Sequence, residues 1–184
     1  MWRYFVWLIA VIGLVFVLVL LLTPSKSKAP IKTPLYNYAN TDVISRLTID
    51  GPINSEEKHQ TIEISVDKSS VTIDQFQGYN HRVVKQQTYA SSPAAYDNFL
   101  HALYHAGFTL GISSGKNSSE LGYCPLGDRY VFELINGGSN IERFWATNCS
   151  GTPKTFNGNI SLNLTLFQAQ VPNYSDFIQN VSLL

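Results

Sequence analysis

An unbroken apolar run from Tyr4 to Leu22 opens this 184-residue chain. As a helix rising about 1.5 Å per residue, about 19 residues span roughly 28 Å, close to the hydrocarbon thickness of a bilayer. A cleaved secretory signal is the competing interpretation, but its apolar core is normally about 7 to 15 residues long. The nearby small-x-small motif Ser27-Lys28-Ala29 is followed by Pro30, which disfavours cleavage. Residues 1–22 are therefore predicted to be a transmembrane signal-anchor, with residues 4–22 in contact with the lipid bilayer.

The segment that follows has a different composition. Residues 23–41 contain prolines at positions 24, 30 and 34 among Ser, Lys and Asn, without apolar periodicity. Proline disrupts a helix and favours extended chain of up to about 3.1 Å per residue. These residues are predicted to form a stalk. Residues 42–184 are predicted to be one folded domain, since about 140 residues suit a single hydrophobic core.

The charges that flank the apolar run leave its orientation open. Arg3 and the amino terminus lie on one side, and Lys26, Lys28 and Lys32 lie on the other. The positive-inside tendency alone favours a cytoplasmic domain. Against this, the domain has two cysteines, few lysines and many Tyr, Ser, Thr and Asn residues, a composition common in exported proteins. We therefore expect a single-pass protein of the cell membrane whose carboxyl-terminal domain is extracytoplasmic.

The charge of the domain bears on its partners. Four of the 13 basic residues precede it, which leaves nine against all 13 acidic residues, a net charge of −4. Phosphate binding needs clustered Lys and Arg, so nucleic acid is not an expected partner. His101 and His105 have the i, i+4 spacing of metal ligands, but no third ligand accompanies them. We expect no metal and no cofactor.

Period-two alternation in the first half of the domain predicts an antiparallel β-meander. Its strands are expected at residues 43–50, 59–66, 71–77 and 81–89. A four-residue loop at 67–70 would pair Val66 with Val71 and Ile64 with Ile73, which puts all four side chains on one face.

One amphipathic helix is expected over residues 92–106. Ser92 can cap its first turn, Pro93 suits the first helical position, and Gly107 can adopt the left-handed conformation that ends a helix. The helical period gathers an apolar stripe that should lie on the sheet. The stripe consists of Tyr96, Phe99, Leu100 and Leu103.

The second half of the domain predicts a β-hairpin, with strands at 128–135 and 141–147, followed by two short helices broken at Pro172. A three-residue loop at 138–140 sorts the hairpin side chains into two faces, whereas a four-residue loop would mix them. The inward set is Tyr130, Phe132, Leu134, Phe144 and Ala146. The outward set is Arg129, Glu133, Arg143 and Trp145. The predicted fold class is α+β: an amino-terminal transmembrane helix, then a meander and a hairpin packed with one amphipathic helix and short carboxyl-terminal helices.

Cys124 and Cys149 flank this hairpin, one before its first strand and one after its second. Pairing of the strands brings both to the same open end, so we predict a disulfide. With about 26 residues enclosed, the loop-entropy model gives roughly 3.5 kcal/mol of stabilisation. Two reduced thiols in a cytosolic protein are the alternative.

The outward hairpin face is the candidate binding surface. Arg129, Arg143 and Trp145 would lie there, and exposed Trp and Arg are enriched at binding hot spots. The alternative is that this face is covered and that Glu133 pairs with Arg143. The predicted function is a binding or interaction domain without catalysis, with an envelope or surface protein as its partner.

Two resemblances accompany these residues. Through Ala94–Leu100, Ala106–Phe108, Cys124–Tyr130 and Trp145–Cys149, the chain resembles uncharacterised single-span exported proteins of ultrasmall, reduced-genome bacteria. This resemblance implies location and architecture but no active site. A strand ending in cysteine within an amino-anchored β-rich domain is also similar to a sortase transpeptidase, which implies a thiol-dependent hydrolase or transpeptidase with Cys149 as nucleophile and His105 as its partner. The arginine that sortases place after the cysteine is missing, because none follows Arg143.

Overall fold

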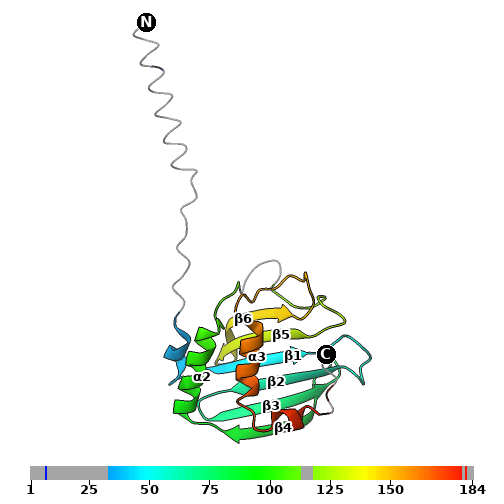
Figure 1. The fold of residues 1–184 in the computed structure, drawn as a ribbon, viewed down its shortest axis with the longest axis horizontal. Coiled ribbons are helices and arrows are strands. Elements are labelled where there is room, and N and C mark those ends of the chain that lie inside the picture. The colour runs from blue at the N-terminus through cyan, green and yellow to red at the C-terminus, as the bar shows by residue number, and fades with distance from the viewer. Residues whose placement is uncertain (1–6, 8–32, 113–117, 180, 182–184) are drawn as a thin grey trace. The chain divides into compact units, whose positions relative to one another are not determined.

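The computed structural model describes residues 7, 33–112, 118–179 and 181. The chain divides into Met1–Lys32 and Thr33–Leu184, and the second unit is an α+β domain (Figure 1). Its elements are, in chain order, η1 (Leu35–Tyr38), β1 (Ile44–Asp50), β2 (Gln60–Val66), β3 (Ser70–Gln77), β4 (Arg82–Ala90), α2 (Pro93–His105), β5 (Arg129–Asn136), β6 (Ser139–Thr147), α3 (Ile160–Gln168) and α4 (Tyr174–Phe177). The predicted meander, helix, hairpin and short carboxyl-terminal helices are all present.

All six strands form one antiparallel sheet in the order β4-β3-β2-β1-β5-β6. The predicted register of the β2–β3 hairpin is confirmed, since Val66 pairs with Val71 and Ile64 with Ile73. The hairpin of β5 and β6 joins the meander because β5 pairs with β1 along its whole length, from Ile44↔Ile135 to Asp50↔Arg129. The meander and the hairpin therefore share one sheet and two common faces.

The β5–β6 turn differs from the prediction. It has two central residues, Gly137 and Gly138, with φ of 55° and 81°, as the tight hairpin turn that fits the strand twist requires. The predicted three-residue loop at 138–140 is wrong. However, the register shift between Leu134 and Ile135 brings the difference between the predicted and the observed pairing to an even number of residues. An even difference leaves each side chain on the predicted face of the sheet. The inward and outward sets of side chains are therefore sorted as expected.

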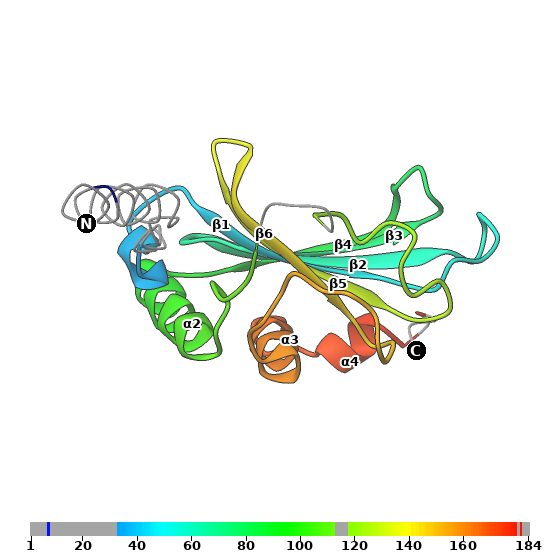
Figure 2. The ribbon, with the colours of Figure 1, turned by 90° about the horizontal axis from the view of Figure 1, so that it is seen from above.

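Helices α2, α3 and α4 lie on one side of the sheet (Figure 2). Ser92 caps α2 by accepting a hydrogen bond from the Ala95 N–H, and Gly107 closes the helix at φ 78°. Phe99 of α2 meets Phe167 of α3 edge to face, with ring centroids 5.1 Å apart. The sheet contributes a continuous buried layer beneath them. This layer includes Leu47, Ile49, Ile62, Ile64, Val66, Ile73, Phe132, Leu134 and Phe144.

The folded domain begins before residue 42, although residues 23–41 are predicted to form a stalk. Leu35 of η1 is fully buried and Ala39 is 4% exposed, and both belong to the hydrophobic core. Tyr36 stacks on His101 of α2 with ring centroids 4.3 Å apart. The prediction of a stalk through residue 41 is wrong for residues 35–39, because Leu35 and Ala39 are buried in the core where η1 packs against α2.

The predicted transmembrane segment, residues 1–22, lies outside the described residues except for Trp7, so it stays a prediction. Within the described part of the chain, no helix combines the length and the apolar content that a bilayer crossing needs.

Candidate functional site

The outward hairpin residues share one face of the sheet, but two of the three are buried. Trp145 has no exposed surface and Arg129 is 3% exposed. Trp145 stacks on Tyr123, with centroids 5.1 Å apart, and its backbone N–H donates to Thr155 Oγ1 at 2.8 Å. The expectation that Arg129 and Trp145 face solvent is wrong, because segments on either side of the hairpin fold over this end of the sheet.

Arg143 is half-buried and tied into ion pairs. Its Nη2 lies 2.8 Å from Glu120 Oε2, and its Nε lies 3.3 Å from Glu133 Oε1. The alternative prediction, a covered face with a Glu133–Arg143 pair, therefore describes this region better than a free binding surface.

Further charges continue across this face towards β4. Arg46 Nε lies 3.2 Å from Glu63 Oε1, and Asp74 accepts from Gln86 Nε2 at 2.6 Å. Burial raises the pKa of Glu63, the Arg46 guanidinium opposes that rise, and the carboxylates of Asp74 and Glu133 add to it. Many charged side chains on the face of the sheet opposite the helices thus pair with one another or with neighbouring polar groups.

Cys124 and Cys149 form a disulfide with Cα atoms 5.7 Å apart, so the predicted pairing is confirmed. A disulfide sulfur is neither a thiolate nor a nucleophile. His105, the other residue carried over from the sortases, is exposed at the end of α2. Within the described residues, no three His, Cys, Asp or Glu side chains converge as a metal site.

The edge of the sheet at β4 offers a different kind of site. Ser91 N–H donates to Ser69 O, which marks a hydrogen-bonded pair at the end of the β3–β4 ladder. Because such pairs alternate along antiparallel strands, the backbone groups of Tyr89 and Gln87 point to β3 and those of Thr88 and Gln86 point outward. No backbone group of any described residue bonds to this outer edge.

The opposite edge of the sheet is closed around Trp145. The N–H groups of Thr155 and Phe156 both donate to Trp145 O at 3.0 Å, and Phe156 also bridges to Gly111. The two edges therefore differ. The segment at residues 155–156 hydrogen-bonds to the outer edge of β6. No backbone group of the described residues bonds in this way to the outer edge of β4.

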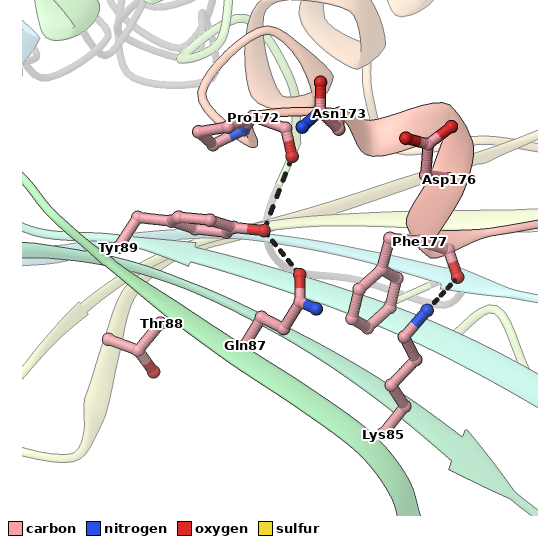
Figure 3. Close-up of a pocket in the computed structure, with 8 residues that line it drawn as sticks. All are labelled: Lys85, Gln87, Thr88, Tyr89, Pro172, Asn173, Asp176 and Phe177. Carbon is pink, nitrogen blue, oxygen red and sulfur yellow. Dashed lines mark hydrogen bonds between the residues drawn. The ribbon is translucent and has the colours of Figure 1, made fainter.

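A groove of about 390 Å³ lies between β4 and α4 (Figure 3). Lys85 Nζ donates to Phe177 O at 2.9 Å and lies 4.3 Å from the centre of the Phe177 ring. Tyr89 Oη donates to Gln87 Oε1 and contacts Pro172 O at 3.4 Å. These contacts hold α4 beside the strand and fix the wall of the groove.

The groove combines a strand whose outer edge is unpaired with side chains of mixed character. Lys85 and Tyr89 are the half-buried residues of β4, and the other seven residues of the strand are exposed. The exposed carboxylate of Asp176 makes no hydrogen bond or ion pair with any described residue. An extended polypeptide could pair with the strand while its side chains meet Lys85, Tyr89 and Asp176.

The sequence contains one signal for this site. Residues 81–89 were predicted to be the last strand of the meander, and they lack the clean apolar alternation of residues 59–66. A terminal strand without a buried apolar set is typical of a sheet edge. The groove itself could not be foreseen, because it depends on where α4 docks.

Comparison with models of known protein families gives no match to this chain, and comparison with curated proteins gives no significant match either. The resemblance to single-span exported proteins therefore stays a prediction.

Proposed function

We propose that this chain is a membrane-tethered, extracytoplasmic binding domain that captures an extended segment of a partner protein along the β4 edge. The observation that carries the proposal is the free outer edge of β4 beside the groove with α4. The disulfide between Cys124 and Cys149 supports an oxidising location, where such bonds persist. The partner would be an envelope or surface protein.

Backbone pairing would supply the affinity. Peptide groups at the edge of a sheet are an unpaired template, and an added strand satisfies them in a defined register. The register shift at Gln75 and Phe76 distorts the first part of β4. Docking would therefore use residues 85–90, with a partner segment of about six residues, the length of an ordinary strand.

Side chains in the groove would supply selectivity. The amine of Lys85 is already engaged by the Phe177 carbonyl and ring, which hold it at α4. The carboxylate of Asp176 lies at the groove without a partner among the described residues. The proposal therefore favours partner segments with a basic side chain placed to meet Asp176.

The test uses the full chain in detergent micelles and random peptides of about 12 residues, twice the length of a typical strand, displayed on phage. Enriched peptides are then titrated against Gln86→Pro, which removes one outward N–H at an edge where proline is otherwise tolerated. Gln86→Thr is the matched control, because it keeps the N–H and suits a strand. Binding should weaken at least about tenfold in the proline variant and stay unchanged in the threonine variant.

Three outcomes would contradict this function. One is that no peptide is enriched, and another is that enriched peptides bind equally to both Gln86 variants. The third is that sedimentation finds a dimer broken only by Gln86→Pro, which would assign the edge to a second copy of this chain.

The thiol-dependent hydrolase or transpeptidase is the competing function, and it requires free Cys149. Titration of thiols in protein purified without reductant separates the two functions. No reactive thiol is expected under denaturing conditions, in keeping with the Cys124–Cys149 bond. One or two thiols per chain would reopen the enzyme interpretation.

A further inference from the structure

A second cavity lies on the face of the sheet opposite the helices, where β1 ends and where β2 and β5 begin. It holds about 290 Å³. Asp50, Thr61 and Arg129 line its inner part, and the exposed side chains of Ile53, Tyr79 and Leu121 also line it. This cavity shares no lining residue with the groove beside β4, so the inference drawn from it does not depend on the proposed β4 site.

Arg129 is the main reason to regard this cavity as a ligand site. Its Nε and Nη2 lie 2.9 Å and 2.7 Å from Asp50 Oδ2, and Nη2 also donates to Gly51 O at 2.7 Å. Its Nη1 makes no hydrogen bond with any described residue. Arg129 is 3% exposed and lines the cavity, so the N–H groups of its Nη1 are donors at the cavity wall without an acceptor among the described residues.

The carboxylates around the cavity are already paired. Asp50 Oδ1 accepts from Thr61 Oγ1 at 3.1 Å and lies 3.0 Å from His59 Nε2. Both oxygens of Glu120 bond to Arg143 Nη2, at 2.9 Å and 2.8 Å. Neither carboxylate therefore requires a cation from a ligand.

His59 is a further neighbour of the Asp50 carboxylate. Its Nε2 faces that carboxylate, and its Nδ1 lies 3.2 Å from the Pro52 carbonyl oxygen. Asp50 is therefore held between His59, Thr61 and Arg129.

We propose that this cavity binds the carboxylate of a ligand with a compact apolar body, through the free N–H groups of Arg129. Thr48 and His81 also line the cavity, and neither residue hydrogen-bonds a described group through its side chain. They supply further donors beside the guanidinium. The apolar body of the ligand lies against Ile53, Tyr79 and Leu121, a combination of few polar groups and an apolar lining that is typical of small-ligand sites.

The test titrates the full chain in micelles with N-acetyl-leucine and with the neutral N-acetyl-leucinamide, by calorimetry. The two probes have the same apolar body, so they isolate the charge. The acid should bind at least about tenfold more tightly, because a charge-assisted hydrogen bond is stronger than a neutral one. Two further arms identify the source of the carboxylate: 4-methylpentanoate represents a free acid, and acetyl-Gly-Gly-Leu represents the carboxyl terminus of a peptide.

An exposed position provides the variant, because replacing Arg129 itself would disturb the fold. Leu121 is 75% exposed, so Leu121→Glu adds a negative charge at the cavity without unfolding the chain, and Leu121→Gln is the neutral control of equal size. The acid should bind about three- to tenfold more weakly to the glutamate variant than to the glutamine variant. Equal binding of acid and amide, no binding of any probe, or equal effects of the two Leu121 variants would overturn the proposal.

Discussion

Tyr96 ties helix α2 to the start of β1, and its hydroxyl makes a sharp prediction about alkaline pH. The side chain is fully buried, and Oη donates to Val43 O at 2.8 Å. Ser45 Oγ lies 3.4 Å from Tyr96 Oη. Burial raises the pKa of Tyr96 to about 12, the Ser45 hydroxyl lowers it slightly, and the negative charge of Asp67 adds to the rise. A tyrosinate could not donate to the Val43 carbonyl.

The size of the effect follows from linkage between protonation and folding. A pKa that is raised in the folded state gives stability that is complete below the unfolded pKa, about 10, and is lost as pH rises towards 12. A shift of about two units corresponds to about 2.7 kcal/mol. Tyr96→Phe removes the titration and the hydrogen bond, so at neutral pH it should cost about 1–2 kcal/mol.

The assay is urea unfolding of wild type and Tyr96→Phe at several pH values between 8 and about 11.5, where the folded pKa of about 12 is approached. The wild type should be more stable at pH 8, and the difference should shrink and reverse in sign as the unfolded tyrosine ionises. Tyr130 and Tyr174, whose pKa values burial also raises, remain in both proteins and cancel. A difference in stability that is constant with pH would refute the reasoning.

Three further perturbations have defined outcomes. Replacing Cys124 and Cys149 together by serine should lower the free energy of unfolding by roughly 3.5 kcal/mol, for a loop of about 26 residues, and added reductant should then have no effect on chemical denaturation. Arg129→Met should cost about 3–5 kcal/mol because it leaves the Asp50 carboxylate under-compensated, and adding Asp50→Asn should recover part of the loss in a double-mutant cycle. Asp67 accepts hydrogen bonds from the N–H and hydroxyl groups of both following serines, and these outweigh the opposing effect of burial and lower its pKa. Asp67→Asn should therefore destabilise by about 1 kcal/mol near neutral pH, and acid titration should abolish the difference as pH falls through that lowered pKa.

The first half of the domain could be predicted from the sequence because its signals are local. The loop at 67–70 has Asp67 bonded to its own turn, so the loop length sets the pairing of Val66 with Val71. The cap at Ser92 and the glycine at 107 likewise mark the ends of α2 within one residue. In each case a short stretch of sequence contains the whole physical cause.

The surface assignments failed because they depend on distant segments. Period two put Trp145 on the correct face of the sheet, but its burial comes from Tyr123 and Thr155, which lie in loops without a periodic pattern. The strand order also depends on pairing between β1 and β5, and alternation within either strand does not specify its neighbour. A long-range contact needs complementary shape, which a pattern of apolar and polar residues does not encode.

The two proposed sites lie on parts of the sheet that the helices do not cover, and the effects of mutations at each site can be measured separately. Helices α2, α3 and α4 bury the apolar face (Figure 2), so the edge at β4 and the cavity beside β1 and β5 remain for binding. The two sites share no lining residue, and effects of sites with no shared partner usually add. Gln86→Pro should therefore weaken enriched peptides without changing N-acetyl-leucine binding, and Leu121→Glu should do the reverse. Loss of both probes in either variant would mean that the sheet couples the two sites or that one variant has lost the fold, and circular dichroism distinguishes these outcomes.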